Sequence, residues 1–437
     1  MVASLTPSEA EVLLAPLARF PRVALAVSGG PDSVALMQLA ARWCKARAAG
    51  PALSVLSVDH GLRAASRGEA ELVGRMAAAL DLPHVILTWN NDGAGAGVQA
   101  RARTARYDLM AAYCHANDIA ALVTAHTLDD QAETFLMRLK RGSGLDGLAA
   151  IPERGAWAGI AVLRPLLDVP KARLVATLDA ARIPFISDPS NIDPRFERAR
   201  LRGSSDALAA LGLTPEALAL SARRLRRARE ALDAAAQEFL AINSEISEAG
   251  YALVASEALD AAPHEIGLRA LSQLIGVVGG GETPLQLAKL ETLLAGLQQD
   301  LGKAHTLGRC RLEPCAGRLG IFREVRGKGL PELRLRPGER LLWDNRFRVE
   351  LAASESKPVM VKALGESGWR HLREGSALAS SLPRLAGRTL PSCWRGDTLL
   401  GLPLLGSDGA DERLGLDCRA RFVRAERPPY TGHPALA

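Results

Sequence analysis

Aromatic residues and cysteines are in short supply in this 437-residue sequence. Phe, Trp and Tyr together make up 4% of the chain, and the six cysteines include no C-x-x-C pair. Such sparse cysteines exclude a disulfide scaffold and give little support to a zinc ribbon or a C-x-x-C redox site. We therefore expect reduced, mostly buried thiols.

Long apolar runs and a basic leader segment are also missing. No apolar stretch approaches the roughly 18 residues that cross a bilayer, and residues 1–20 carry Glu9 and Glu11 rather than a positive segment. These absences predict a cytoplasmic protein with no membrane partner. The 54 basic and 48 acidic residues give a net charge of +6, which permits a polyanionic partner without requiring one.

The first part of the sequence has the pattern of a parallel α/β sheet. Short β-rich runs alternate with amphipathic helical stretches from residue 20 to about residue 190, as in strands joined by crossover helices. A further helix is expected after Asp168, a candidate N-cap. The expected strands lie at residues 22–27, 53–58, 84–89, 119–124 and 162–167, with helices at about 34–47, 99–116 and 129–140.

Beyond residue 190 this alternation stops. The spacing of apolar residues predicts one long helix over residues 214–240, and helix-like spacing continues to about residue 301. From residue 307 onward, Gly and Pro interrupt short alternating runs, which indicates a small β-containing domain. We therefore predict a parallel-sheet α/β domain at 1–210, a helical domain at 211–310 and an α+β domain at 311–437.

The first expected strand runs into the hexapeptide Ser-Gly-Gly-Pro-Asp-Ser at residues 28–33. A strand, a tight glycine turn and a helix N-terminus together present backbone N–H groups to an anion. Gly29 and Gly30 let the backbone approach a phosphate closely, and the hydroxyls of Ser28 and Ser33 can donate to its oxygens. The loop matches neither a Walker loop nor the G-x-G-x-x-G fingerprint. The alternative is a plain turn whose polar residues cap the helix.

Polar residues also follow the second and fourth expected strands. Asp59 and His60 stand just past a carboxyl strand end, where open α/β sheets bind ligands. In the helix after the fourth strand, Asp130 and Glu133 share one face and suit Mg²⁺ or an ammonium group. Carboxylates near a helix N-terminus also suit the helix dipole, so capping is the alternative. His126 precedes this helix and is placed to touch a nucleotide.

Arginines gather in three places along the sequence. One pair lies on the helix at 99–116, a second group follows the sheet region, and a third lies on the helix at 214–240. Each group is either a solvated face or a set of phosphate contacts, and the second group also suits developing phosphate charge. The candidates for RNA contact are Arg103, Arg106, Arg198, Arg202, Arg223, Arg224 and Arg227.

The hexapeptide at 28–33 resembles the PP-loop of the N-type ATP pyrophosphatases, which split ATP into AMP and pyrophosphate while adenylating a substrate. Further segments resemble those of the tRNA(Ile)-lysidine synthetases in order and spacing over about residues 20–205. Family members often carry a second histidine where Thr127 stands here, which puts a role for that position in doubt. The segments that resemble those of the tRNA(Ile)-lysidine synthetases begin at Asp59, Gln99, Ala125, Arg141, Arg164 and Asp188.

The resemblance implies that the domain at 1–210 is catalytic, that the domains at 211–310 and 311–437 bind tRNA, and that the reaction has two steps. ATP adenylates the 2-oxo group of the wobble cytidine in the CAU anticodon of a minor tRNA(Ile), and pyrophosphate leaves. The ε-amine of free L-lysine then attacks C2 and displaces AMP, so that the tRNA reads AUA and accepts isoleucine. Catalytic roles are expected for Asp32, Asp130, Glu133 and Arg200, with Mg²⁺ on Asp32 and Asp130. The residues expected to bind ATP are Ser28, Gly29, Gly30, Pro31, Asp32, Ser33, Asp59, His60 and His126.

Two other classes of protein stay open. A PP-loop tRNA thiolase would attack an adenylated base with sulfur and generally needs catalytic or cluster-binding cysteines, for which the sequence offers no suitable pair near the site. A non-catalytic RNA-binding protein with a degenerate nucleotide fold would need neither the intact loop nor the pair of Asp130 and Glu133. The oligomeric state also stays open, with a homodimer as the preferred assembly.

Overall fold

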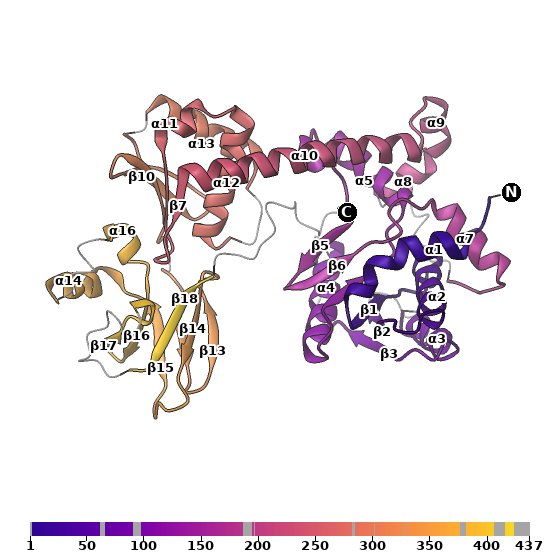
Figure 1. Ribbon diagram of the computed structural model, residues 1–437, viewed down its shortest axis with the longest axis horizontal. Coiled ribbons are helices and arrows are strands. Elements are labelled where there is room, and N and C mark those ends of the chain that lie inside the picture. Colours follow the sequence, from indigo (N-terminus) through magenta and orange to yellow (C-terminus); the bar gives the residue numbers. More distant parts are fainter. Residues whose placement is uncertain are drawn as a thin grey trace. The chain divides into compact units, whose positions relative to one another are not determined.

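The chain forms two compact units, which divide between Arg229 and Glu230 inside one long helix (Figure 1). None of the helices in the described part is long and apolar enough to cross a bilayer. The division into domains at 1–210, 211–310 and 311–437 stays a prediction. The computed structural model describes residues 2–61, 66–90, 98–186, 195, 197–281, 285–300, 302–327, 329–375, 382–405 and 416–423.

The first unit is built on a six-stranded sheet with the order β3-β2-β1-β4-β6-β5. All neighbouring pairs are parallel except β5 with β6, so the predicted parallel sheet is confirmed. The edge strand β5 was not expected, because its sequence Arg-Gly-Ala-Trp contains no apolar run. The strands are β1 (Arg22–Ala26), β2 (Ala52–Asp59), β3 (His84–Thr88), β4 (Ala121–Val123), β5 (Arg154–Trp157) and β6 (Ile160–Leu163).

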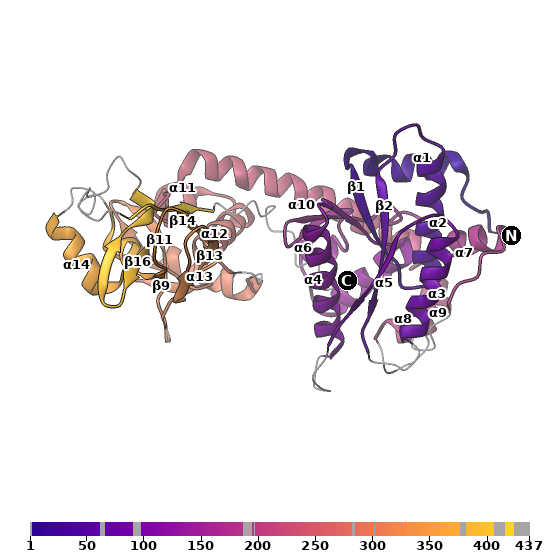
Figure 2. The ribbon, with the colours of Figure 1, turned by 90° about the horizontal axis from the view of Figure 1, so that it is seen from below.

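Helices cover both faces of this sheet (Figure 2). One face carries α1 (Pro7–Leu14), α2 (Pro31–Lys45), α3 (Ser66–Ala78) and α7 (Lys171–Ala180), and the other carries α4 (Val98–Ala116). Val23 and Leu25 of β1 pack toward the first group, whereas Ala24 packs toward α4. This alternation is what a strand buried on both faces requires.

Two predicted helix starts are wrong, the first by three residues and the second by two. α2 begins at Pro31, inside the hexapeptide, because proline fits the first turn of a helix without losing a hydrogen bond. α7 begins at Lys171, and Asp168 is not its N-cap, because Pro170 has an extended ψ of 136° that separates Asp168 from the helix. The Asp168 carboxylate instead accepts a hydrogen bond from Arg223 at 2.7 Å.

A smaller apolar cluster continues the first unit beyond the sheet. α5 (Leu128–Lys140), α6 (Leu145–Leu148) and the first part of α10 (Pro215–Asn243) share it through residues that include Phe135 and Leu218. Two short helices, α8 (Glu197–Gly203) and α9 (Ser205–Ala210), precede α10. α8 therefore lies in the chain directly before the helix that packs on α5.

The second unit contains three sheets and confirms the prediction of a β-containing C-terminal region. Its first sheet has the order β7-β8-β11-β10-β9, and two smaller sheets have the orders β12-β15-β16-β17 and β13-β14-β18. β7 and β8 lie within the stretch expected to be helical, where they are only three residues long each. The elements are β7 (Ser244–Ile246), β8 (Ala252–Val254), α11 (Ser256–Ala261), α12 (His264–Gly279), α13 (Leu287–Gln299), β9 (His305–Leu307), β10 (Cys310–Cys315), β11 (Arg318–Arg323), β12 (Leu333–Leu335), β13 (Arg340–Trp343), β14 (Phe347–Leu351), β15 (Val359–Ala363), α14 (Gly365–Gly375), α16 (Arg384–Gly387), β16 (Pro391–Arg395), β17 (Thr398–Gly401) and β18 (Cys418–Phe422).

Candidate active site

The glycine turn between β1 and α2 is held by its own hydrogen bonds. Gly29 has φ +89°, and a Cβ there would lie 2.4 Å from the side chain of Ile186, so only glycine fits. The Ser33 hydroxyl donates to the Gly30 carbonyl at 3.0 Å and accepts from the Ser28 N–H at 3.2 Å. Ser33 is thus buried inside the turn and fixes its shape. The turn leaves the N-terminus of α2 open to an anion.

Asp32, in the first turn of α2, has one paired and one unpaired oxygen. Its Oδ2 accepts from the Lys171 ammonium at 3.0 Å, while its buried Oδ1 has no hydrogen-bond partner among the described residues. Burial raises the pKa of Asp32, and the charge of Lys171 opposes that shift. An unpaired, buried carboxylate oxygen is costly unless a cation or a proton satisfies it. The Oδ1 atom therefore marks a position for a cation.

Asp130 serves both as a cap and as a partner for arginine. Its Oδ2 accepts from the N–H of Thr127 at 2.9 Å and from the Thr127 hydroxyl at 3.1 Å, which forms a capping box at the start of α5. Burial would raise the pKa of Asp130, but His126, Arg198 and the bonds from Thr127 outweigh it and lower that pKa. The capping alternative thus accounts for one oxygen. The other, Oδ1, lies 3.7 Å from Arg198.

Glu133 lies one turn further along α5 and is paired with α8. Arg202 donates to both of its oxygens, at 3.2 Å for the Nη2 bond, and Arg198 Nε lies 3.7 Å away. Burial raises the pKa of Glu133 in spite of the ion pair with Arg202. Arg198 Nη2 is buried without a hydrogen-bond partner among the described residues. The pairing between α5 and α8 is therefore incomplete.

The spacing in α8 decides which arginines reach the acids. Arg198 and Arg202 are four residues apart and share a face, whereas Arg200 lies about 200° around the helix from Arg198. Arg200 is exposed and donates to the carbonyl of Arg195 at 3.1 Å. The structure therefore brings together Asp130 and Glu133 with two residues that we expected to contact RNA. Arg200, which we expected to be catalytic, lies on the opposite side of α8.

The turn after β2 places a histidine beside a tryptophan. Asp59 accepts from the N–H of Gly61 at 3.0 Å and from the Ser66 hydroxyl, so it fixes the turn, and these bonds lower its pKa. The His60 ring lies edge-on to Trp89 with centroids 6.2 Å apart. Burial lowers the pKa of His60, and its buried Nδ1 has no hydrogen-bond partner in the described part of the chain. A neutral ring with a free nitrogen is suited to a polar ligand.

His126 follows β4 at the same carboxyl edge of the sheet. Its Nδ1 lies 2.9 Å from the Thr124 hydroxyl, and burial lowers its pKa to about 3, so the ring is neutral at pH 7. Arg103 is close enough to contribute to this shift, and its own pKa is lowered to about 10 by burial. Arg103 and Arg106 both flank the Tyr107 ring, at 5.7 and 5.9 Å. Neither is therefore on a freely solvated face.

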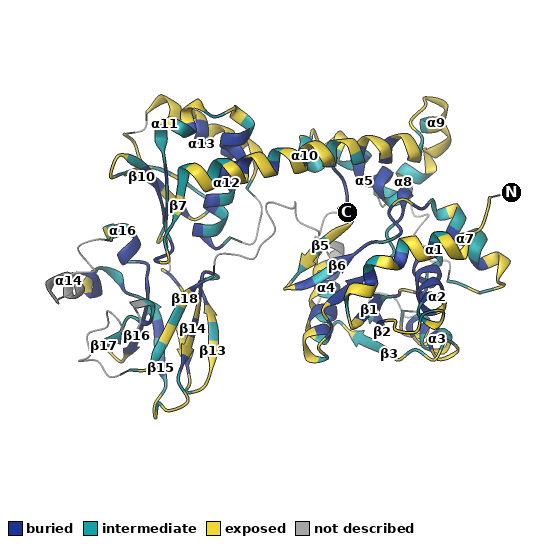
Figure 3. Cartoon of the chain, in the orientation of Figure 1, coloured by how far each residue is buried: buried dark blue, intermediate teal, exposed yellow. Residues whose placement is uncertain are grey.

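Two basic residues in this region were missed as site candidates. Arg164 is buried and donates to the carbonyl of Pro152 at 3.0 Å, and it had a signal in the Arg-Pro-Leu-Leu segment. No sequence signal pointed to Lys171, since its partner Asp32 is 139 residues away. On α10, Arg224 and Arg227 are exposed as expected for RNA contact, while Arg223 is half-buried and bound to Asp168. Exposed and buried positions alternate along this helix (Figure 3).

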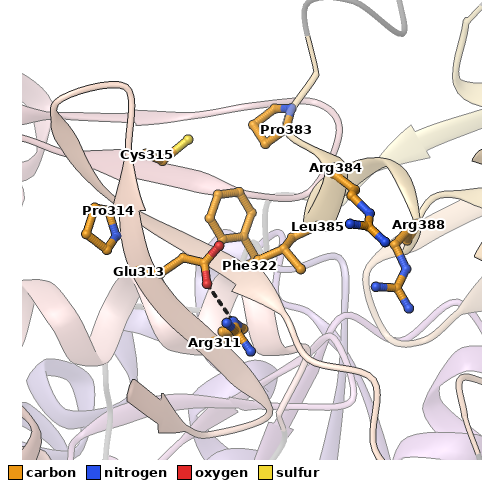
Figure 4. A pocket seen from close by; sticks show the side chains of 9 residues that line it. All are labelled: Arg311, Glu313, Pro314, Cys315, Phe322, Pro383, Arg384, Leu385 and Arg388. Carbon is orange, nitrogen blue, oxygen red and sulfur yellow. Dashed lines mark hydrogen bonds and ion pairs between the residues drawn. The ribbon is translucent and has the colours of Figure 1, made fainter. Parts of the chain in front are cut away.

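A cavity of about 390 Å³ lies in the second unit, between β10 and α16 (Figure 4). Its charged residues are already paired: Arg311 contacts Glu313 at 2.6 Å, and the arginines of α16 and the following turn contact Glu366. These pairs leave little net charge for a ligand. The lining residues are Arg311, Glu313, Pro314, Cys315, Phe322, Pro383, Arg384, Leu385 and Arg388.

A parallel sheet, a glycine turn after its first strand and acids at the carboxyl ends of neighbouring strands define a PP-loop nucleotide-binding enzyme. The PP-loop domain family matches residues 6–205. The chain is 48% identical over 299 residues to a tRNA(Ile)-lysidine synthase of Rhodopseudomonas palustris, covering 68% of this chain and 86% of that one. A tRNA(Ile)-lysidine synthase of Ruegeria pomeroyi is 37% identical over 396 residues, covering 88% and 89%.

The chain belongs to the tRNA(Ile)-lysidine synthases. The resemblance predicted from the hexapeptide and the later segments is thus confirmed, as are the enzyme class and ATP use. The thiolase alternative is not favoured, because the curated relatives are lysidine synthases.

Proposed function

We propose that this chain joins free L-lysine to C2 of the wobble cytidine in a minor tRNA(Ile) with a CAU anticodon. The observation that carries the proposal is the arrangement of the glycine turn at 28–33 beside Asp32, Asp130 and Glu133. The turn accepts phosphates, and the acids suit the two cations that the reaction needs. In this proposal the protein acts in the cytoplasm and forms a homodimer.

The ATP phosphates bind at the N-terminus of α2 in this proposal. Backbone N–H groups of the turn donate to phosphate oxygens, while Ser33 keeps the turn in shape. The free Nδ1 of His60 offers a further hydrogen bond to the nucleotide. The neutral ring of His126 donates or accepts without adding charge next to the adenylated base. These groups are fixed before ATP arrives, so little reorganisation is required.

Mg²⁺ fits this site through Asp32. The ion usually takes one or two protein carboxylates and completes its shell with water and substrate phosphates. The unpaired Oδ1 of Asp32 supplies one such ligand, and Asp130 is the neighbouring candidate. Among the described residues no larger group of His, Cys, Asp and Glu is arranged for a metal, which agrees with a site completed by ATP. When bound, the ion would offset the charge of the departing pyrophosphate.

Glu133 and the Oδ1 atom of Asp130 suit the ammonium group of lysine. Both face Arg198, whose contacts of 3.7 Å are longer than hydrogen bonds. An incoming ammonium group can therefore displace Arg198 from Asp130 Oδ1, whereas at Glu133 it would share the carboxylate with Arg202. The raised pKa of Glu133 also makes this carboxylate a candidate to take the proton that the ε-amine must lose before it attacks.

The tRNA would be held by arginines outside this acid cluster. Arg224 and Arg227 are exposed on α10 and form the surface that we assign to phosphate contacts, with Arg223 beside them. Such contacts fix the position of the tRNA without reading its sequence. Arg103, whose charge acts on His126, and Arg106, whose charge acts on His60, would contact the anticodon region in this proposal.

The test is incorporation of labelled lysine into a minor tRNA(Ile) transcript with ATP and Mg²⁺, together with measurement of AMP. A methionine tRNA with the same anticodon is the control. Lysine bound only to the isoleucine tRNA, with one AMP per lysine, is the expected result. AMP release without incorporation of lysine would contradict the proposal and require another nucleophile.

A further inference from the structure

Lys171 joins three helix N-termini at the nucleotide site. It is the first residue of α7, and its N–H donates to Asp129 in the first turn of α5 at 2.7 Å. Its side chain runs the other way, to Asp32 in the first turn of α2, where the ammonium group lies 3.0 Å from Oδ2. The backbone bond fixes where the side chain starts. The ammonium group is consequently held within the PP-loop itself.

The ion pair of Lys171 and Asp32 differs from an ordinary surface pair. The two side chains are 34% and 21% exposed, whereas Lys45 and Asp81, also 3.0 Å apart, are 64% and 84% exposed. The Lys171 ammonium is therefore partly withdrawn from water but still accessible from the site. Lysine carries a point charge on a flexible stem, so it exchanges partners more readily than the forked guanidinium of arginine. It can turn from Asp32 to another anion without moving α7.

We propose that Lys171 contacts the ATP phosphates and leaves Asp32 when they bind. Phosphates held by the turn at 28–33 lie next to Asp32, which is part of that turn, and thus within reach of the same ammonium group. Transfer of the ammonium group brings a cation to the phosphates and frees a second oxygen of Asp32. The inference rests on the proposed function only in taking ATP as the ligand of the loop.

A double-mutant cycle separates this role from simple neutralisation of Asp32. The variants are Lys171→Met, Lys171→Arg, Asp32→Asn and the double variant Asp32→Asn with Lys171→Met. Equilibrium binding of ATP is measured in EDTA and without tRNA, so that neither metal nor turnover contributes. Lys45→Met, which breaks the exposed pair with Asp81, is the matched control, and thermal unfolding of each variant checks the fold.

We expect Lys171→Met to weaken ATP binding about tenfold in both backgrounds, because a charge-assisted contact with the phosphates is lost. Lys171→Arg should stay within about threefold of wild type, since it keeps the charge. Asp32→Asn alone should bind ATP at least as tightly as wild type, because Lys171 no longer has a competing partner. Lys45→Met should leave the affinity for ATP unchanged.

Two results would overturn the inference. One is wild-type affinity for ATP in Lys171→Met. The other is a Lys171→Met loss that disappears in the Asp32→Asn background, which would mean that Lys171 only neutralises the carboxylate. Failure of the proposed function is recognised separately, by wild-type protein that binds ATP but does not incorporate lysine.

Discussion

Two clusters of acids and arginines, one in each unit, differ in how completely their polar atoms are hydrogen-bonded. In the second unit Asp344 accepts from Arg323 at 2.9 Å on both oxygens and from Arg346 at 2.7 Å, and all three residues are buried. The remaining nitrogens of Arg346 donate to the carbonyls of Gly250 and Thr389. Every nitrogen of that guanidinium thus has an acceptor.

The cluster in the first unit has polar atoms whose hydrogen bonds are not all formed. Arg198 lies 3.7 Å from both Asp130 and Glu133, and its Nη2 lacks a hydrogen-bond partner within the described residues, as does Asp32 Oδ1. Buried polar groups without partners cost stability, so folding alone does not account for them. A completed network fixes structure, whereas an incomplete one is ready for ligands. The comparison predicts that substitutions in the first cluster impair activity and those in the second impair stability.

The largest effect is expected at Asp32. Replacing it with alanine removes the free Oδ1 atom and the partner of Lys171, so AMP formation should fall about a thousandfold or more. The free energy of unfolding should change by less than about 1 kcal/mol, because the native carboxylate is itself poorly satisfied. AMP release in the presence of tRNA and chemical denaturation measure the two quantities. Normal turnover would remove Asp32 from the site.

Asp344→Ala should show the opposite behaviour. It leaves Arg323 and Arg346 buried without their carboxylate, which typically costs about 3–5 kcal/mol of unfolding free energy. Glu366→Ala is the control, since that acid pairs with two arginines but is partly exposed, and it should cost under about 1 kcal/mol. Equal losses in the two variants would mean that burial does not distinguish these clusters.

Local signals made much of the first cluster predictable. The glycine turn, Asp59, His60, Asp130 and Glu133 could be found because each stands at a strand end or in the first two turns of a helix.

The identity of the arginines that pair with the acids also had a local signal. Helical spacing alone places Arg198 and Arg202 on one face and Arg200 on the other. Lys171 was not predictable, because its partner is 139 residues away and meets it only through the fold. The parallel sheet followed from its apolar runs, but the edge strand β5, with no such run, did not.

An intermediate effect is expected at three arginines of α10, of which Arg224 and Arg227 are exposed and Arg223 is half-buried beside Asp168. Reversing Arg223, Arg224 and Arg227 to Glu should weaken tRNA binding about 10- to 100-fold and flatten its salt dependence, while ATP binding stays unchanged. A control that reverses Arg19, Arg42 and Arg75, three exposed arginines elsewhere in the first unit, makes the same change in net charge. An equal loss in both variants would assign the effect to net charge alone, and unchanged tRNA affinity in the first would refute the predicted surface.

The smallest effect is a difference in acid sensitivity between buried groups of the two units. Burial holds His126 neutral with a pKa of about 3, below the usual 6.5, so between pH 6.5 and 3 the unfolded chain binds a proton that the folded chain does not. Stability therefore falls as the pH drops, by no more than about 1.4 kcal/mol per pH unit from this group.

Arg323 and Arg346 lower the pKa of Asp344 below 3.8 against the effect of burial. Asp344 therefore loses its contribution to the free energy of unfolding only below about pH 4. Unfolding free energies of wild type and His126→Asn at pH 7 and pH 5 separate the two windows. The wild type should lose about 1–2 kcal/mol more than the variant over this range. Parallel pH dependence in both proteins would show that His126 takes up its proton equally in the folded and unfolded chains, which would contradict the lowered pKa of this buried ring.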